Sequence, residues 1–91
     1  MTAVSLSLDG ELTVINAAEQ HERLLRALDG SRLDVSLAGV TDLDTAGLQV
    51  LLFLSREAAR RSVPVSFAGH SPAVLEVLRL VGLSPSLEVD T

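Results

Sequence analysis

The sequence contains no cysteine, no tryptophan and no tyrosine, and its aromatic side chains are limited to two phenylalanines. Without cysteine the chain can form neither disulfides nor thiolate metal sites, and it has no cysteine nucleophile. Two histidines are too few for a typical histidine-based metal site. The scarcity of aromatic rings also removes the stacking platforms on which proteins bind single-stranded nucleic acids.

Positive charge and long apolar runs are scarce as well. Seven basic residues, all of them arginine, stand against twelve acidic residues, so the net charge is −5 and phosphate backbones are repelled. The longest apolar run, Val50–Leu54, is far shorter than the roughly 20 residues that cross a bilayer. The first residues lack the basic stretch and apolar core of a signal peptide. We therefore expect a cytoplasmic protein with no nucleic-acid partner and no direct membrane insertion.

The composition is that of one small folded domain spanning residues 1–91, because 47% of the residues are apolar and only 21% are charged. No linker, repeat or low-complexity segment divides the chain. Alternating apolar and polar residues predict a first strand over Val4–Leu8. The pair Asp9-Gly10 predicts a hairpin turn, after which Glu11–Ile15 returns as an antiparallel second strand.

Helical patterns alternate with the later strands. Asn16, followed three residues later by Glu19, predicts a capped helix over Ala17–Leu28. The remaining pattern predicts strand, helix, strand, helix and a short last strand, over Leu33–Leu37, Ala46–Arg61, Val63–Phe67, Pro72–Val81 and Leu87–Val89. This order indicates an α/β fold in which a mixed four- to five-stranded sheet is packed by helices.

One aromatic side chain falls on the polar face of the second predicted helix. A helical wheel places the core face at Leu48, Leu51, Leu52, Ser55, Ala58 and Ala59. Phe53 lies on the opposite face, between Gln49 and Arg56, and Val50 and Leu54 flank that face. Because aromatic residues anchor interfaces, we expect Phe53 to be exposed in the monomer and covered by a partner or by a second copy in a weak homodimer.

The most informative stretch is Val40–Leu48, where a strand ends, polar residues cluster and a helix begins. Asp44 or Thr45 can cap the free N–H groups at the helix start. Ala46 and Gly47 leave that start bare, so that a large partner can approach it closely. Taken alone, the pattern is more typical of an ordinary N-cap followed by small residues that allow close packing.

No catalytic set accompanies this stretch. Asp44, His70 and Ser71 contain the right side chains for a hydrolase triad, but no nucleophile elbow surrounds a serine or threonine. Ser71 is better explained as an N-cap, because Pro72 follows it at the first helical position. The glycines are too scattered for a phosphate-binding loop. We therefore expect no enzymatic activity, no cofactor and no metal.

Three motifs together carry a family resemblance. The run Leu37–Leu48 resembles the signature of STAS domains, the family of anti-sigma-factor antagonists. Gly10-Glu11-Leu12 is similar to the Gly-Glu-Leu of these domains, and the segment from Ser71 to Leu83 resembles their third helix. The resemblance covers nearly the whole chain and implies the STAS fold. It also implies a bacterial signal-transduction role, as a non-enzymatic phosphoprotein in transcription regulation.

The resemblance also implies how such a protein is switched. In the family, the residue after the aspartate is phosphorylated by a partner kinase, the anti-sigma factor, which the phosphorylated form releases. The phosphoacceptor would be Thr45, where the family usually has serine, and Thr13 stands where the family often has aspartate. The implied partner-binding residues are Asp42, Leu43, Asp44, Thr45, Ala46 and Gly47, to which the polar face of the second helix adds Gln49 and Phe53.

A second use of the same surface follows from a further resemblance. The Asp-Thr-small-Gly-Leu form at Asp44–Leu48 is similar to the small STAS subunit of bacterial phospholipid-transport ABC systems. In those systems the helix start docks on the ATPase subunit. The partner is therefore either an anti-sigma factor with a kinase-like ATPase fold or a transporter ATPase, and the residues leave the choice open.

Overall fold

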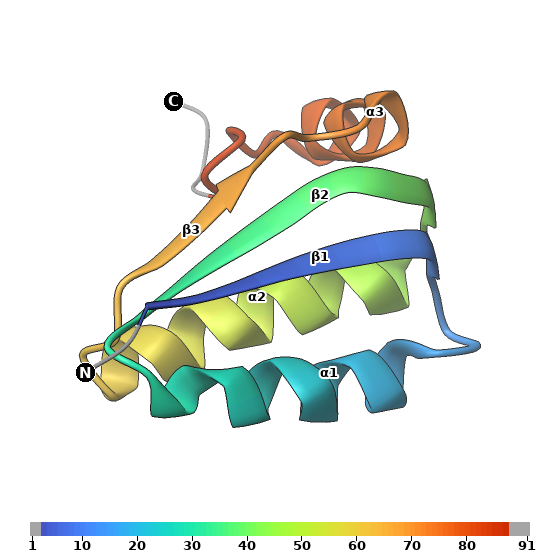
Figure 1. The fold of residues 1–91 in the computed structure, drawn as a ribbon. Coiled ribbons are helices and arrows are strands. Elements are labelled where there is room, and N and C mark those ends of the chain that lie inside the picture. The colour runs from blue at the N-terminus through green and yellow to red at the C-terminus, as the bar shows by residue number, and fades with distance from the viewer. Residues whose placement is uncertain (1–2, 88–91) are drawn as a thin grey trace.

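The computed structural model describes residues 3–87. Strands and helices alternate along the chain as predicted, and the α/β class is confirmed (Figure 1). The elements are β1 (Ala3–Leu12), α1 (Ala17–Arg26), the short 3-10 helix η1 (Ala27–Asp29), β2 (Arg32–Leu43), α2 (Thr45–Arg60), β3 (Val65–Ala68) and α3 (Pro72–Val81).

The strands of the described residues form one sheet in the order β1-β2-β3, and both neighbouring pairs are parallel. The central strand is β2, as predicted for Leu33–Leu37. Helices α1 and α2 cover one face of the sheet, and α3 lies on the other side (Figure 1). Leu33, Val35 and Leu37 alternate along β2 with at most 1% exposure, so this strand forms the centre of the core.

The predicted hairpin at Asp9-Gly10 is wrong. Both residues lie inside β1, whose register with β2 shifts between Ser7 and Asp9 and again between Gly10 and Glu11. Gly10 has a φ of 77°, which glycine adopts without steric cost, and here this conformation serves a bulge rather than a turn. The described residues therefore form three parallel strands instead of a mixed sheet of four or five. The predicted strand Leu87–Val89 lies mostly outside the described residues.

The predicted capping box of Asn16 and Glu19 is also wrong. The side chain of Asn16 makes no hydrogen bond to the start of α1. Its Oδ1 accepts a hydrogen bond from the backbone N–H of Thr13 at 3.0 Å, and its Nδ2 donates to the carbonyl oxygen of Glu11 at 2.7 Å. Asn16 therefore stabilises the connection that precedes α1, and the helix still begins at the predicted residue, Ala17.

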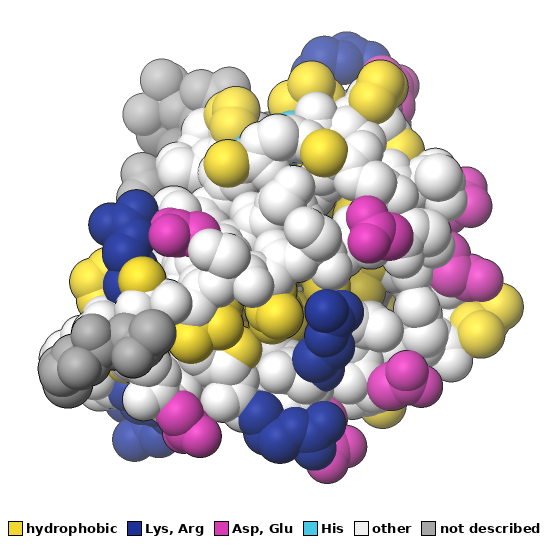
Figure 2. Space-filling view, viewed as in Figure 1, with side chains coloured by type: hydrophobic (Ala, Val, Ile, Leu, Met, Phe, Trp, Pro, Cys, Tyr) yellow, Lys and Arg dark blue, Asp and Glu magenta, His cyan; other side chains and the backbone are white. Residues whose placement is uncertain are grey.

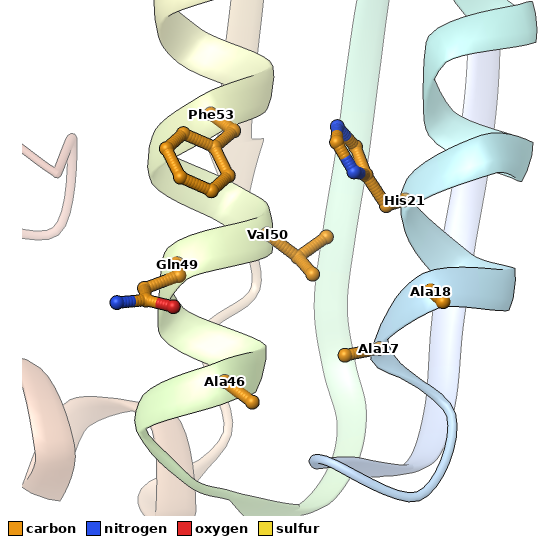
Figure 3. A pocket seen from close by; sticks show the side chains of 7 residues that line it. All are labelled: Ala17, Ala18, His21, Ala46, Gln49, Val50 and Phe53. Carbon is orange, nitrogen blue, oxygen red and sulfur yellow. The ribbon is translucent and has the colours of Figure 1, made fainter.

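The buried face of α2 is rotated relative to the predicted one. Val50 and Leu54 are buried, whereas Leu52 and Ser55 are half-buried and Ala59 is exposed. The reason is that α2 packs against α1 as well as against the sheet, and Val50 points toward α1 (Figure 3). A wheel drawn for one helix contains no information about this second contact.

Candidate functional site

Helix α2 begins at Thr45, immediately after the carboxyl end of the central strand. Asp44 has an extended backbone, and its Oδ1 accepts a hydrogen bond from the backbone N–H of Gly47 at 2.9 Å. Asp44 is therefore the N-cap, and Thr45 is the first helical residue. Thr45 is an exposed residue.

The second carboxylate oxygen of Asp44 serves a different segment. Asp44 Oδ2 accepts a hydrogen bond from the backbone N–H of Val14 at 2.9 Å. The hydrogen bonds from Gly47 and Val14, in that order, hold the pKa of Asp44 below its usual range. At neutral pH an ionised carboxylate therefore joins the start of α2 to the connection between β1 and α1.

The small residue pair at the helix start has a packing role. A Cβ atom at Gly47 would overlap the carbonyl oxygen of Leu12, the last residue of β1. Gly47 is itself buried, whereas Ala46 and Leu43 are half-buried. The absence of a side chain at Gly47 therefore lets α2 approach the end of β1 closely.

The connection between β1 and α1 presents two apolar side chains, at positions where the sequence predicts a strand. Val14 is 74% exposed and Ile15 is 80% exposed. The backbone beneath them is held by local hydrogen bonds, because Ile15 N–H donates to Thr13 Oγ1, and Thr13 Oγ1 donates to Glu11 at 2.6 Å. Thr13 and Asn16 flank the pair, and such residues often bond to nearby backbone in turns. This flanking pattern was the available signal in the sequence.

A shallow groove of about 220 Å³ runs between α1 and α2 and reaches Ala46 in the first turn of α2 (Figure 3). It is lined by Ala17, Ala18, His21, Ala46, Gln49, Val50 and Phe53. The ring of His21 stacks on Phe53 with 6.1 Å between ring centroids, and the Arg56 guanidinium lies 5.7 Å from the Phe53 centroid. Phe53 is nevertheless 44% exposed, which confirms its predicted exposure.

The charges around the site follow from the topology. Parallel strands end, and helices α1 and α2 begin, at the same end of the molecule. The acidic residues there are Asp9, Glu11, Glu19, Asp42 and Asp44, and no arginine occurs in residues 3–22 or 33–55. Figure 2 shows acidic side chains gathered toward the right of the view, where the strands end in Figure 1. The surface around Thr45 is therefore acidic, with exposed apolar side chains within it.

The side chains of a hydrolase triad are not assembled. Asp44 is bonded to Gly47 and Val14, whereas Ser71 Oγ accepts a hydrogen bond from the backbone N–H of Val74 as the predicted cap of α3. His70 Nε2 lies 2.6 Å from the carbonyl oxygen of Pro85. Within residues 3–87 no three His, Asp or Glu side chains are grouped to hold a metal ion. The same residues include no helix with the length and hydropathy that crossing a bilayer requires.

These features define a small α/β domain with a parallel sheet and an exposed helix start at its carboxyl edge. A family model described as "Mlab, STAS domain" matches residues 2–88. The chain therefore belongs to the STAS domain family, as its sequence motifs predict. No curated protein shows significant sequence similarity to it.

Solved structures show the same fold. The anti-sigma factor antagonist SpoIIAA, in its unphosphorylated form, matches with a TM-score of 0.76 and 20% identity over 100% of this chain and 84% of its own. The STAS domain of a SulP transporter from Vibrio cholerae matches with a TM-score of 0.65 and 24% identity over 88% of this chain. The match spans 63% of that domain. A sulfate transporter family protein from Wolinella succinogenes matches with a TM-score of 0.68 and 18% identity, over 96% of this chain and 76% of that one.

Proposed function

We propose that this chain is a regulatory protein-binding module that docks on its partner through the start of α2 and is released when Thr45 is phosphorylated. The observation that carries the proposal is the position of Thr45. It is the exposed first residue of the helix, between Asp44, which accepts a hydrogen bond from Val14 N–H, and Ala46, which lines the groove. The similarity to SpoIIAA, an anti-sigma factor antagonist, supports this assignment.

A phosphate at Thr45 would act on docking more than on folding. It adds about −1.5 to −2 charges and three strongly hydrated oxygens at the centre of the surface. Free N–H groups at the start of α2 favour an anion at this place, so the fold tolerates the group. Any partner that contacts Thr45 closely would meet added bulk and charge.

The partner in this proposal is an anti-sigma factor with a kinase-like ATPase fold, which supplies both the nucleotide and the phosphoryl transfer. The chain itself acts as a non-enzymatic cytoplasmic switch. Because Asp42 and Asp44 directly precede the helix start, the complementary surface of the partner is basic at its rim.

A second candidate is an accessory subunit that docks on the ATPase of a phospholipid-transport ABC system. It is favoured by the form of Asp44–Leu48, which is similar to the small STAS subunit of those systems, and by the match to the family model described as "Mlab, STAS domain". The same helix start and groove serve as the docking surface in both candidates, so the identity of the partner separates them.

The test is a comparison of four forms of the full chain as bait in native lysate. The forms are wild type, wild type phosphorylated at Thr45, Thr45→Glu and Thr41→Glu. Thr41 is also exposed and lies on β2 just before the site, so Thr41→Glu controls for added charge. We expect one ATPase to be retained by wild type and Thr41→Glu and lost by the other two forms. Equal retention by phosphorylated and unphosphorylated chain would contradict the switch, and mass spectrometry of the retained ATPase would decide between the two candidates.

A further inference from the structure

Among residues 3–87, one long edge of the sheet has no neighbouring strand. In the described part of the chain, β2 is the one strand that pairs with β1, and β1 extends over ten residues. Figure 1 shows β1 at the margin of the sheet, with β2 beside it and no described strand on its other side. Exposed strand edges are templates for pairing, and natural proteins guard them with charges, prolines or bulges.

In β1, the features that protect an exposed edge from pairing occur only in the second half of the strand. The register shifts around Asp9 and Gly10 make the strand irregular there, and Asp9 and Glu11 add negative charge. Arg23 Nη2, from α1, reaches the carbonyl oxygen of Ser7 at 3.5 Å, the limit of a hydrogen bond. The first half of the strand, Ala3–Leu6, contains no charge, no proline and no register shift.

The backbone of this half presents a regular set of free groups. The guanidinium of Arg23, from α1, reaches the Ser7 carbonyl, and this contact fits a carbonyl that faces away from β2. Successive residues of a strand turn their backbone groups to opposite sides, so Ala3 and Ser5 present theirs to the same edge. Val4 and Leu6 then face β2, with which this half pairs in unbroken register. Three residues at a spacing of two form the pattern with which an antiparallel strand pairs.

We propose that the occupant of this edge is a second copy of the chain, whose β1 pairs antiparallel with this one across a two-fold axis at Ser5. Ser5 then lies opposite Ser5 of the partner subunit, and Ala3 lies opposite Ser7 of the partner subunit. Val4 lies opposite Leu6 of the partner subunit, on the face of the sheet that α1 and α2 cover. Apolar side chains meet apolar ones and small polar ones meet small ones, so the segment is complementary to itself.

Burial and charge favour the same arrangement. Val4 and Leu6 belong to the core side of the sheet but are only half-buried in the monomer, and the second copy covers their exposed flank. The acidic Asp9 and Glu11 of the two copies lie at opposite ends of the paired segment. The register shifts confine regular pairing to Ala3–Ser7, so the interface is small and the dimer is weak.

The dependence of association on salt and on Arg23 distinguishes this dimer from a complex held by opposite charges. Each copy carries a net charge of −5, so salt screens a repulsion and strengthens the dimer. Arg23 must leave the Ser7 carbonyl before the second strand can pair, so Arg23→Ala promotes association. The interface lies at the end of the sheet away from Thr45, and Thr45→Glu therefore leaves it unchanged.

The test is sedimentation velocity of the full chain, up to a concentration of about 1 mM, because weak interfaces associate in this range. We expect a monomer–dimer equilibrium that Ser5→Asp weakens at least tenfold, because two carboxylates then meet at the two-fold axis. Ser5 is exposed, so this variant keeps the fold. Ala68→Asp, at an exposed position of β3, is the matched control and leaves association unchanged. A chain that stays monomeric at every concentration, or a dimer that Ser5→Asp does not weaken, would overturn the proposal.

A second measurement identifies the register. In a mixture of differently isotope-labelled copies, the α-protons of Val4 and of the partner subunit's Leu6 approach closely in an antiparallel pair that shares no hydrogen bonds. We expect a nuclear Overhauser effect between them that crosses the subunits. A dimer without this contact, or one that forms through the groove at Phe53, would show the β1 pairing to be wrong.

Discussion

The carboxylate of Asp44 accepts a hydrogen bond from the backbone amide of Val14, a residue that precedes it by 30 positions in the chain. The same carboxylate caps α2 through Gly47. One side chain therefore fixes two neighbouring parts of the surface, the helix start with Thr45 and the connection that carries Val14 and Ile15. The candidate docking surface is built jointly by two connections at the carboxyl end of the sheet.

Removal of this carboxylate is expected to destabilise the domain. Asp44→Ala loses the cap of α2 and the tie to Val14, and we expect the Tm to fall by several degrees. Asp42→Ala is the matched control, because Asp42 is an exposed acid on the preceding strand. Thermal unfolding followed by circular dichroism measures both variants. A Tm for Asp44→Ala equal to that of Asp42→Ala would show that the two hydrogen bonds contribute nothing to stability.

The lowered pKa of Asp44 predicts the pH dependence of stability. The folded state binds this proton less readily than the unfolded chain, whose aspartate pKa is about 3.9. The contribution is therefore complete above that value and is lost as the pH falls through the lower folded pKa. Glu57 also contributes stability that is lost at acid pH, because hydrogen bonds from Arg60 and Arg61 lower its pKa to about 2.

Urea unfolding across the acid range checks this expectation. Wild type should lose stability as the pH falls from about 5 toward 2, and Asp44→Asn should show a shallower slope because it carries no titrating group there. Glu57→Gln should flatten the slope between the unfolded glutamate pKa of about 4.3 and the folded value of about 2. Identical slopes for wild type and Asp44→Asn would contradict the assignment of the low pKa to Asp44.

The parts of the fold that neighbouring residues determine were predictable from the sequence. The parts that depend on a distant strand or helix were not. The start of α3 was predictable, because Ser71 and Pro72 cap it from adjacent positions, and Gly82, with a φ of 76°, ends it. The Asp9-Gly10 pair was not, because glycine with positive φ suits both a hairpin turn and a bulge. Only the pairing partner, β2, decides between them.

The candidate site divides in the same way. The helix start at Asp44 and Thr45 was predictable, since capping and small residues are properties of consecutive positions. The exposed pair Val14 and Ile15 was only partly predictable: Thr13 and Asn16 beside it are a local signal, but Val14 N–H donates to Asp44, which lies far along the chain. The phase of α2 was only partly predictable, since its contact with α1 depends on tertiary packing.

Gly47 provides a test of the close approach between α2 and β1. Glycine-to-alanine changes inside helices usually stabilise, by up to about 1 kcal/mol. Here the added Cβ would overlap the Leu12 carbonyl, and we expect a loss of about 1–3 kcal/mol, typical of overpacking. Gln49→Ala, at an exposed position of the same helix, is the control for helix propensity. Urea unfolding measures the free energy of unfolding of each variant. A value for Gly47→Ala equal to that of wild type would contradict this prediction.

Phe53 tests whether the exposed face of α2 serves binding or folding. Phe53→Ala should cost clearly less than the roughly 3–5 kcal/mol of a core Phe→Ala change, because the ring is partly exposed and pairs with His21 and Arg56 at the surface. Leu54→Ala, at the fully buried neighbouring position, should cost about 2–5 kcal/mol. Unfolding free energies that reverse this order would show that Phe53 is a core residue.

The exposed pair Val14 and Ile15 yields the sharpest prediction about docking. The pair is presented by a connection that hydrogen bonds already order, so little entropy is lost when a partner covers it. We expect the double variant Val14→Ser/Ile15→Ser to keep the Tm of wild type and to bind the partner ATPase at least tenfold more weakly. Titration calorimetry with the ATPase that wild type retains measures this change. Leu80→Ser/Val81→Ser alters another adjacent pair of exposed apolar residues, on α3 and away from Thr45, and should bind as wild type does. If both double variants bound alike, Val14 and Ile15 would not belong to the docking surface. The phosphorylation switch would still stand in that case, provided that Thr45→Glu abolished binding.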